Sequence, residues 1–276
     1  MSQLSEEEQQ QHKEGVKKVF DTVSPDYGRG GCRFFHSCGE YMASQLPLRG
    51  NERVIDVAAG TGATAIPLAK HLPHGRVTAL DLSPAMLEQT EAFAKQNQLS
   101  NIETLEGDFT KLPFEPQSFH HATCAFGLFF VPEMGAALKH IASKVRSSGS
   151  VTISGFCGDS FLPGAQLCLD RLQTYGLEVP EQIAWRRMSE PAQLELIFKE
   201  AGLKDLKIDR KSFGYHVSLD EWWDVIWNAG LRGLVSQLDE KLEEFKQAHF
   251  EELKPLCSKE GLWLEIDVNF SRGIVA

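Results

Sequence analysis

No stretch of the sequence reaches 18 consecutive apolar residues, and residues 1–11 are polar and acidic. The first absence predicts that no helix spans a membrane, and the second argues against a secretory signal peptide. No cysteine pair has C-x-x-C spacing, so a zinc or redox motif has no support. We therefore expect a cytoplasmic protein with reduced cysteines, no bound metal and no stable membrane anchor. The six cysteines are Cys32, Cys38, Cys124, Cys157, Cys168 and Cys257.

Positive charge is also scarce. The chain has 28 Lys and Arg against 38 Asp and Glu, which gives a net charge of -10. Such a chain repels a polyphosphate backbone, so we expect no nucleic-acid partner. The close basic pairs Lys17-Lys18 and Arg186-Arg187 are interpreted as solvated surface charge.

Strand-like and helix-like segments alternate along the middle of the chain. Short apolar runs at 54–57, 77–80, 102–105, 122–126 and 151–153 are separated by helical patterns. This alternation predicts a doubly wound α/β fold with a mostly parallel sheet. We divide the 276 residues into an N-terminal helical segment (1–46), a core (47–155), a cap insertion (156–188) and the remaining core (189–276) with a helical insertion at 213–260.

Two capping boxes mark helix starts outside the core. Ser5 with Glu8 opens a helix predicted to end near Thr22, and Ser218 with Glu221 opens one predicted to continue to about Leu256. Ser189 is predicted to cap a further helix, and residues 263–275 to hold a final strand.

A glycine-rich turn follows the first predicted strand. Gly60-Thr61-Gly62 lets the backbone approach a ligand closely, and the next helix offers free N–H donors. The same turn with Ala65 and Asp81 also fits a dinucleotide fingerprint, so at this point NAD and S-adenosylmethionine both remain open. Asp56 before the glycines disfavours a pyrophosphate and suits a ligand that carries an ammonium and a sulfonium.

Three later segments, each after a strand, favour S-adenosylmethionine. Asp108 in Gly107-Asp108-Phe109 can accept a hydrogen bond from an adenine amino group, and Phe109 can pack on the ring. Leu82 and Met86 are placed to close the other side of that ring. Phe126-Gly127-Leu128 brings backbone to the methionine portion.

As a set, these motifs resemble the class I S-adenosylmethionine-dependent methyltransferases over residues 54–151. The matching segments are Val-Ile-Asp-Val-Ala-Ala-Gly-Thr-Gly from Val54, Leu-Asp-Leu-Ser-Pro-Ala-Met-Leu from Leu80, and Gly-Asp-Phe from Gly107. The resemblance implies a Rossmann-like sheet of seven strands with one antiparallel strand, here at 266–275. It also implies ribose at Asp81, adenine at Asp108 and Phe109, and the methionine end near Asp56, Ala58, Gly60 and Phe126. The whole predicted cofactor set is Tyr27, Asp56, Ala58, Gly60, Thr61, Gly62, Asp81, Leu82, Met86, Gly107, Asp108, Phe109, Phe126 and Gly127.

A narrower resemblance concerns the ubiquinone/menaquinone biosynthesis C-methyltransferases. It is carried by residues 19–27, Val-Phe-Asp-Thr-Val-Ser-Pro-Asp-Tyr, and by Phe126-Gly127-Leu128. In those enzymes the N-terminal segment folds over the cofactor, which implies a contact from Tyr27. Quinone C-methylation is therefore an alternative to the broader function, methyl transfer to a small apolar or aromatic molecule at oxygen or carbon.

Methyl transfer to a phenol or a carbon acid benefits from a general base. The candidates are His36, His216 and Tyr215, in segments expected to cover the site. Aromatic side chains are predicted to line the acceptor pocket, and each also fits a plain core position: Phe34, Phe35, Phe129, Phe156, Phe161, Trp185, Trp222 and Trp223.

Three competing functions follow from the same pattern. An NAD-dependent oxidoreductase would use a pair such as Tyr-x-x-x-Lys, which does not occur. A non-catalytic nucleoside-binding interaction protein would not need the intact cofactor set. An RNA or protein methyltransferase fits poorly with the acidic charge and the absence of an Asn-Pro-Pro-Tyr motif. The expected partners are a small-molecule acceptor and, at most, a second copy, as a monomer or homodimer.

Overall fold

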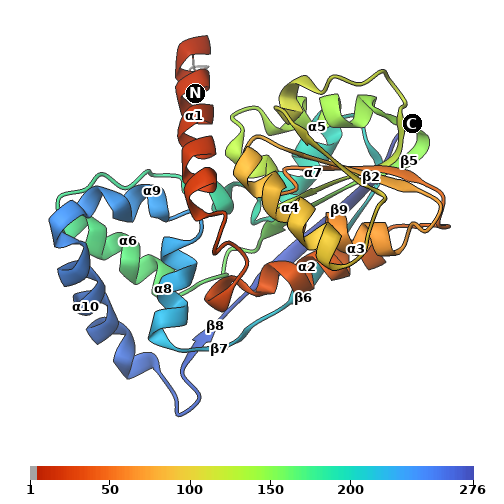
Figure 1. Cartoon of the computed structure of the whole chain (residues 1–276). Helices are drawn as coiled ribbons and strands as arrows, with labels where there is room; N and C mark the ends of the chain where they lie inside the picture. Colours follow the sequence, from red (N-terminus) through yellow and green to blue (C-terminus); the bar gives the residue numbers. More distant parts are fainter. Residues whose placement is uncertain (1–4) are drawn as a thin grey trace.

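The computed structural model describes residues 5–276 and is built on a seven-stranded sheet of order β3-β2-β1-β4-β5-β9-β6 (Figure 1). β9 runs antiparallel to both β5 and β6, and the pairings among β1 to β5 are parallel. The predicted fold class and the predicted antiparallel strand are confirmed. The strands of this sheet are β1 (Arg53–Val57), β2 (Arg76–Asp81), β3 (Ile102–Glu106), β4 (Phe119–Ala125), β5 (Val145–Phe156), β6 (Lys204–Ser212) and β9 (Asp267–Ile274).

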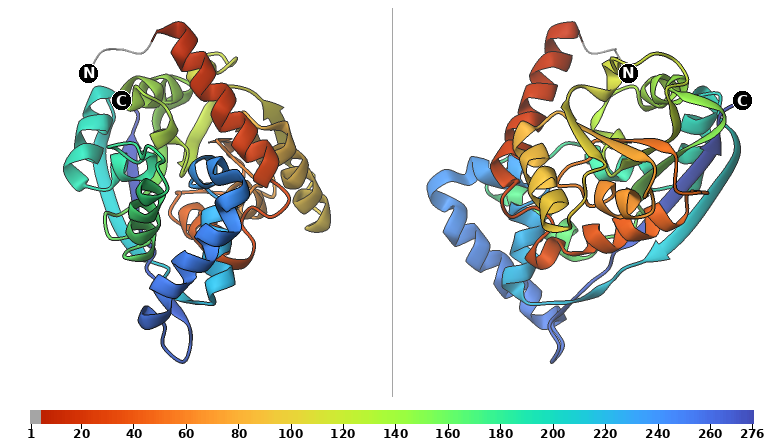
Figure 2. Two further views of the ribbon diagram at one scale, coloured as in Figure 1. Left: turned by 90° about the vertical axis from the view of Figure 1, so that its left-hand side faces the viewer. Right: turned by 45° about the vertical axis from the view of Figure 1, so that its right-hand side comes forward.

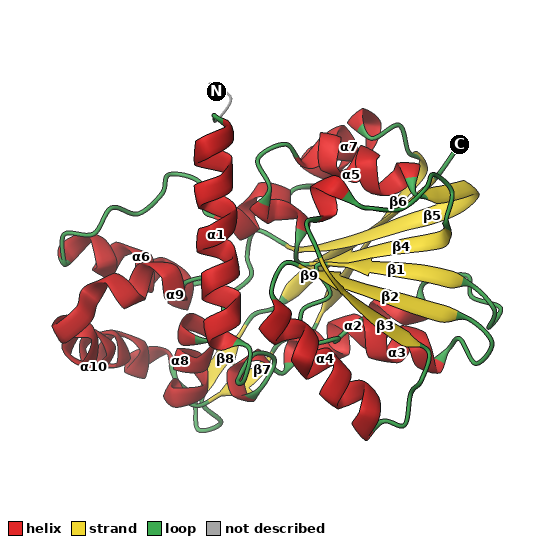
Figure 3. Ribbon diagram, turned by 45° about the horizontal axis from the view of Figure 1, so that its top comes forward, coloured by secondary structure: helices red, strands yellow, loops and turns green. Residues whose placement is uncertain are grey.

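Helices cover both faces of the sheet, as Figure 3 shows. One face carries α2 (Phe34–Ser44), α3 (Ala65–Lys70) and α4 (Pro84–Gln96), and the other carries α5 (Met134–Ser143) and α7 (Pro191–Glu200). Because both faces are covered, side chains on both sides of the central strands are buried: Val54, Ile55 and Val57 of β1 are fully buried. Parallel pairing also brings the carboxyl ends of β1, β2, β3 and β4 to one edge, where ligands bind in such sheets.

A helical layer stands beside the sheet and is built from the two intervals predicted as insertions (Figure 1). It holds α6 (Gly164–Thr174), α8 (Leu219–Trp227), α9 (Arg232–Val235) and α10 (Leu242–Leu253), with a small sheet of β7 (Tyr215–Val217) and β8 (Leu262–Leu264) below. Helix α1 (Glu6–Val23) stands between this layer and the main sheet (Figure 2).

The helix predicted from Ser218 to about Leu256 is not continuous. The capping box at Ser218 is confirmed, but α8 ends at Trp227, and the chain turns through Asn228 to Gly230 before α9. A second break lies at Asp239, whose φ of 46° is not helical. The helix predicted to be capped by Ser189 is instead capped by Glu190, whose capping box includes Gln193.

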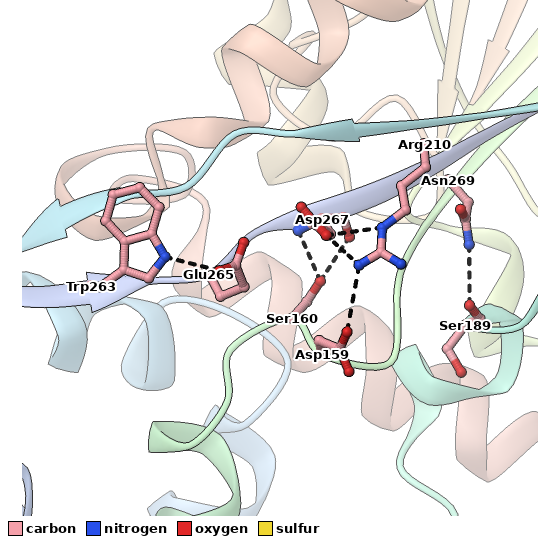
Figure 4. A network of polar contacts seen from close by, with 8 residues as sticks. All are labelled: Asp159, Ser160, Ser189, Arg210, Trp263, Glu265, Asp267 and Asn269. Carbon is pink, nitrogen blue, oxygen red and sulfur yellow. Dashed lines mark hydrogen bonds and ion pairs between the residues drawn. The ribbon is translucent and has the colours of Figure 1, made fainter. Parts of the chain in front are cut away.

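A polar cluster fixes the first insertion to the sheet (Figure 4). Arg210 of β6 is paired with Asp267 of β9 and reaches Asp159 at 3.5 Å. The Ser160 hydroxyl donates to the main-chain carbonyl of Asp267 at 2.7 Å, and the Asn269 amide donates to the Ser189 carbonyl at 3.1 Å. Both ends of the 156–188 interval are therefore held against β9.

Gly39→Ala tests the contact between α2 and α3. A Cβ at Gly39 would lie 2.0 Å from the Ala63 carbonyl oxygen, so the helices must separate, and we expect a loss of about 1–3 kcal/mol in the free energy of unfolding. Gly15→Ala on α1 is the matched control, because a Cβ added at Gly15 would meet nothing within 4 Å. The higher helix propensity of alanine should raise the free energy of unfolding by up to about 1 kcal/mol. Urea unfolding measures the stability of the two variants. Equal urea midpoints for Gly39→Ala and Gly15→Ala would contradict the packing argument.

Candidate active site

Two turns meet at the carboxyl edge of the sheet. Ala58 after β1 and Phe126 after β4 both adopt positive φ, 53° and 54°, which non-glycine residues rarely do. A Cβ on Gly127 would lie 2.4 Å from the Cβ of Ala58, so glycine is required for the turns to pack this closely. The strained backbone at the ends of two adjacent strands indicates a ligand site.

The Asp81 carboxylate lies at the end of β2 beside these turns. One of its oxygens accepts the Gly60 N–H at 2.8 Å and the other accepts the Ser83 N–H at 2.9 Å. Burial raises the pKa of Asp81, while these two bonds oppose the rise. The carboxylate therefore fixes the glycine turn and still has lone pairs for a ligand hydroxyl.

Asp108 follows β3 and is held from two sides. One oxygen accepts the main-chain N–H and the hydroxyl of Thr110, at 2.8 and 2.7 Å, and the other lies 2.5 Å from the Lys13 ammonium. Burial alone would raise the pKa of Asp108, but the bonds from Lys13 and Thr110 outweigh it and hold that pKa below its ordinary value.

Helix α1 closes this cleft. Besides Lys13, its Lys17 donates to the Leu82 carbonyl at 3.1 Å and pairs with Glu106 at 2.5 Å. Its Asp21 accepts a 2.6 Å hydrogen bond from the Ser83 hydroxyl. These contacts tie one face of α1 to the ends of β2 and β3.

An aromatic cavity of about 360 Å³ adjoins the cleft, between the sheet edge and the helical layer. Phe126 and Phe156 stack within its wall at 4.5 Å between ring centres, and Tyr27 stacks on Phe35 at 4.8 Å. The cleft and the cavity share lining residues, so the two spaces lie next to each other. The shared residues are His12, Phe20, Tyr27, Phe126 and Phe130.

Comparison with known proteins identifies the class of enzyme. Residues 54–149 match the model of a methyltransferase domain. Over 223 residues the chain is 28% identical to demethylmenaquinone methyltransferase of Geobacillus kaustophilus, covering 74% of this chain and 95% of that one. It is 33% identical over 145 residues to the Staphylococcus aureus enzyme of the same name, covering 51% and 59%. The chain is a class I S-adenosylmethionine-dependent methyltransferase.

Solved structures show the same fold. The YcgJ protein of Bacillus subtilis superposes on the methyltransferase with a TM-score of 0.60 at 19% identity, covering 87% of this chain and 98% of that one. The [4+2]-cyclase SpnF superposes with a TM-score of 0.57 at 15% identity, covering 96% and 94%. No helix among residues 5–276 of the methyltransferase is long and apolar enough to span a bilayer.

The cleft fits the cofactor S-adenosylmethionine by its chemistry. Two carboxylates, Asp81 and Asp108, suit ribose hydroxyls and an amino group, and apolar Leu82, Met86 and Phe109 line the same cleft. The match to a methyltransferase domain decides between NAD and S-adenosylmethionine, which the glycine turn left open.

The structure brings most of the predicted cofactor residues to the cleft. Those that line it are Tyr27, Ala58, Gly60, Asp81, Leu82, Met86, Gly107, Asp108, Phe109, Phe126 and Gly127. Thr61, Gly62 and Asp56 lie outside the lining. Asp56 is 1% exposed and accepts the Thr123 hydroxyl at 2.7 Å, and its second oxygen is buried without a partner.

The aromatic residues predicted for the acceptor pocket line the cavity, with the exception of Trp223. Trp223 stacks on Trp227 at 6.3 Å and packs against Phe245 within the helical layer. The three predicted bases lie outside both linings. His36 is exposed, the Tyr215 hydroxyl donates to the Gly31 carbonyl at 2.9 Å, and His216 pairs with Glu260 at 3.1 Å.

Sequence reasoning missed the residues that α1 contributes to the cleft: His12, Lys13, Val16, Lys17 and Phe20. The three- and four-residue spacing of 13, 16, 17 and 20 was the available indication that one helix face is buried.

The prediction of solvated basic pairs is wrong for Lys17 and for Arg187. The Arg187 guanidinium donates to the carbonyls of Phe129, Val131 and Pro132 at 2.7–2.9 Å. Burial lowers its pKa. It fixes the loop after β4, which lines both the cleft and the cavity.

Asp56 gives the methyltransferase a testable pH dependence of stability. Burial raises the pKa of Asp56 from an ordinary value of 3.8 to about 7, against the opposing bond from Thr123. Between about pH 4 and pH 7 the folded state therefore holds a proton that the unfolded state has lost. The resulting stability is fully present below about pH 4 and is lost as the pH rises through 7. The difference in unfolding free energy between wild type and Asp56→Asn should fall over this range and then level. If the difference in unfolding free energy does not change with pH, the raised pKa of Asp56 is refuted.

Proposed function

We propose that the methyltransferase transfers a methyl group from S-adenosylmethionine to a small apolar or aromatic molecule held in the aromatic cavity. The observation that carries this proposal is that the cavity lies directly beside the cofactor cleft and shares lining residues with it. An acceptor among these rings would be shielded from water next to the cofactor.

Within this proposal, Asp81 binds the ribose, and Asp108 with Phe109 binds the adenine. The turns at Ala58, Gly60 and Gly127 hold the methionine portion. The N-terminal segment 1–46, of which residues 1–4 lie outside the described structure, covers the cofactor through its described part, and the intervals 156–188 and 213–260 form the acceptor cap. The positions of α1 over the cleft and of Trp185 and Trp222 in the cavity wall support these assignments.

The bound cofactor supplies a methyl group already activated on a sulfonium. The chain then has to align the acceptor and exclude water, and alignment alone can contribute on the order of 7–11 kcal/mol to lowering the barrier. The stacked rings of Phe126 and Phe156 form a flat wall for a planar acceptor. Arg187 keeps the loop at Phe129 and Phe130 in place between the two spaces.

A second candidate is C-methylation of a quinone precursor. It is supported by the identity of 28% with a demethylmenaquinone methyltransferase over nearly its whole length. The proposal further includes a cytoplasmic location, a monomer or homodimer, and no nucleic-acid substrate.

Asp81→Asn tests the cofactor assignment. The amide donates where the carboxylate accepts, so the Gly60 and Ser83 bonds and the ribose contact cannot all persist, and we expect at least a tenfold weaker affinity for S-adenosylmethionine. Calorimetric titration with S-adenosylmethionine measures it. Asp170→Asn on α6 is the control, because Asp170 is exposed and does not line the cleft. Equal affinities in both variants would reject the ribose contact.

Gly230→Phe tests the acceptor cavity. Gly230 lines the cavity and lacks a positive φ, and a Cβ added there would meet nothing within 4 Å, so the backbone there accepts a side chain. We expect a higher KM for aromatic acceptors and unchanged binding of S-adenosylmethionine. Gly15→Phe on α1, outside the cavity lining, should change neither. An unchanged KM in Gly230→Phe would place the acceptor elsewhere.

A further inference from the structure

His12 lies where the cofactor cleft and the aromatic cavity meet, and its side chain lines both. It comes from α1, and no motif in the sequence marks it. The histidines at 36 and 216 line neither space.

One hydrogen bond fixes which nitrogen of His12 carries the proton. Nε2 lies 2.8 Å from the main-chain carbonyl oxygen of Phe130. A carbonyl oxygen can only accept, so Nε2 must be the donor. In the neutral ring the lone pair is then on Nδ1, which is left as a proton acceptor.

The docking of α1 holds this imidazole in place. Lys13 on Asp108, Lys17 on the Leu82 carbonyl and Asp21 on the Ser83 hydroxyl fix the helix along its length. The accepting carbonyl is fixed too, because Arg187 binds the carbonyls of Phe129 and Val131 on either side of Phe130. Both partners of the His12 bond are thus positioned by other contacts.

Few other groups in the cavity could take a proton. Among the described residues that line it, the titratable side chains are His12 and Tyr27. Burial raises the pKa of Tyr27, so its hydroxyl stays protonated. The charged groups facing His12 are Lys13, which is paired with Asp108, and Glu133 across the adjoining pocket.

We propose that His12 is the general base of the methyltransferase and that its acceptor is an aromatic hydroxyl compound; this rests on the proposed function above. The hydroxyl proton of the acceptor passes to Nδ1 of His12. The acceptor oxygen forms the new bond to the methyl carbon, and the carbon–sulfur bond breaks with its electron pair left on sulfur. His12 is exposed, so the imidazolium returns its proton to water.

His12→Gln is the informative variant. The glutamine amide can still donate to the Phe130 carbonyl, but it has no basic nitrogen in place of Nδ1. We expect kcat toward an aromatic hydroxyl to fall at least about 100-fold, with unchanged affinity for S-adenosylmethionine. His74→Gln is the control, because His74 is exposed and lies between α3 and β2, away from both linings.

A binding measurement gives a readout that does not depend on turnover. The absorbance spectrum of 2-naphthol bound to the protein with S-adenosylhomocysteine reports whether its hydroxyl is ionised. We expect ionisation at a lower pH in wild type than in His12→Gln. Equal ionisation in the two proteins would overturn the role of His12.

The acceptor panel is 2-naphthol, 1,4-dihydroxynaphthalene and 2-naphthylamine. Methylation of a hydroxyl compound that is lost in His12→Gln supports the inference. Equal rates in the variant, or methylation of the amine alone, overturn the inference and leave the proposed function standing. If wild type binds S-adenosylmethionine and methylates none of the three, the aromatic acceptor and the base are both rejected.

Discussion

The carboxylate of Asp81 joins the parts of the sequence that make the cofactor cleft. Through the Gly60 and Ser83 N–H groups it connects the turn after β1 to the first turn of α4, across two neighbouring strands. Ser83 then binds Asp21 of α1 and caps α4. One buried carboxylate thereby links the sheet edge, the helix that follows it and the helix that covers it. The placement of α1, and so of every residue that α1 brings to the cleft, depends on this connection.

Charge explains why α1 docks here. The ends of β2 and β3 carry Asp81, Glu106 and Asp108, three acids on one edge of an acidic chain. Lys13 forms an ion pair with Asp108, and Lys17 forms one with Glu106. Pairs this exposed contribute little to stability individually, so their main effect is to set the register of α1. A helix moved by one turn would lose both ion pairs together and would carry His12 away from Phe130.

The core of the fold and most of the cleft follow from local sequence. Strand ends, glycine turns and the cap at Ser83 lie within a few residues of each other, so Asp81, Asp108 and Gly127 can be assigned from short motifs.

The start of β5 was not predicted from the sequence, because Ser147, Ser148 and Gly149 resemble a turn. In the structure β5 already begins at Val145. There the register between β4 and β5 shifts, and Ser148 takes a φ of 63°. Contacts over long sequence separations, such as His12 with Phe130 and Arg187 with Val131, have no local pattern and required the structure.

The two halves of the active site differ in how they are built, and this bears on what the methyltransferase acts on. The cleft is formed largely by backbone turns and short acids within residues 54–149, the segment that matches the methyltransferase domain. The cavity takes Phe34 and Phe35 from before that segment and Phe156, Phe161, Trp185 and Trp222 from after it. Gly164 lets the Trp222 ring pack against α6, His249 accepts its indole N–H at 2.9 Å, and Asp224 of α8 accepts the Gly31 N–H at 3.4 Å, so this wall is held by residues outside 54–149. A chain can therefore keep the cofactor half of a quinone methyltransferase and present a different surface to the acceptor. The cavity that we propose for the acceptor thus takes much of its lining from outside the segment that matches the methyltransferase domain.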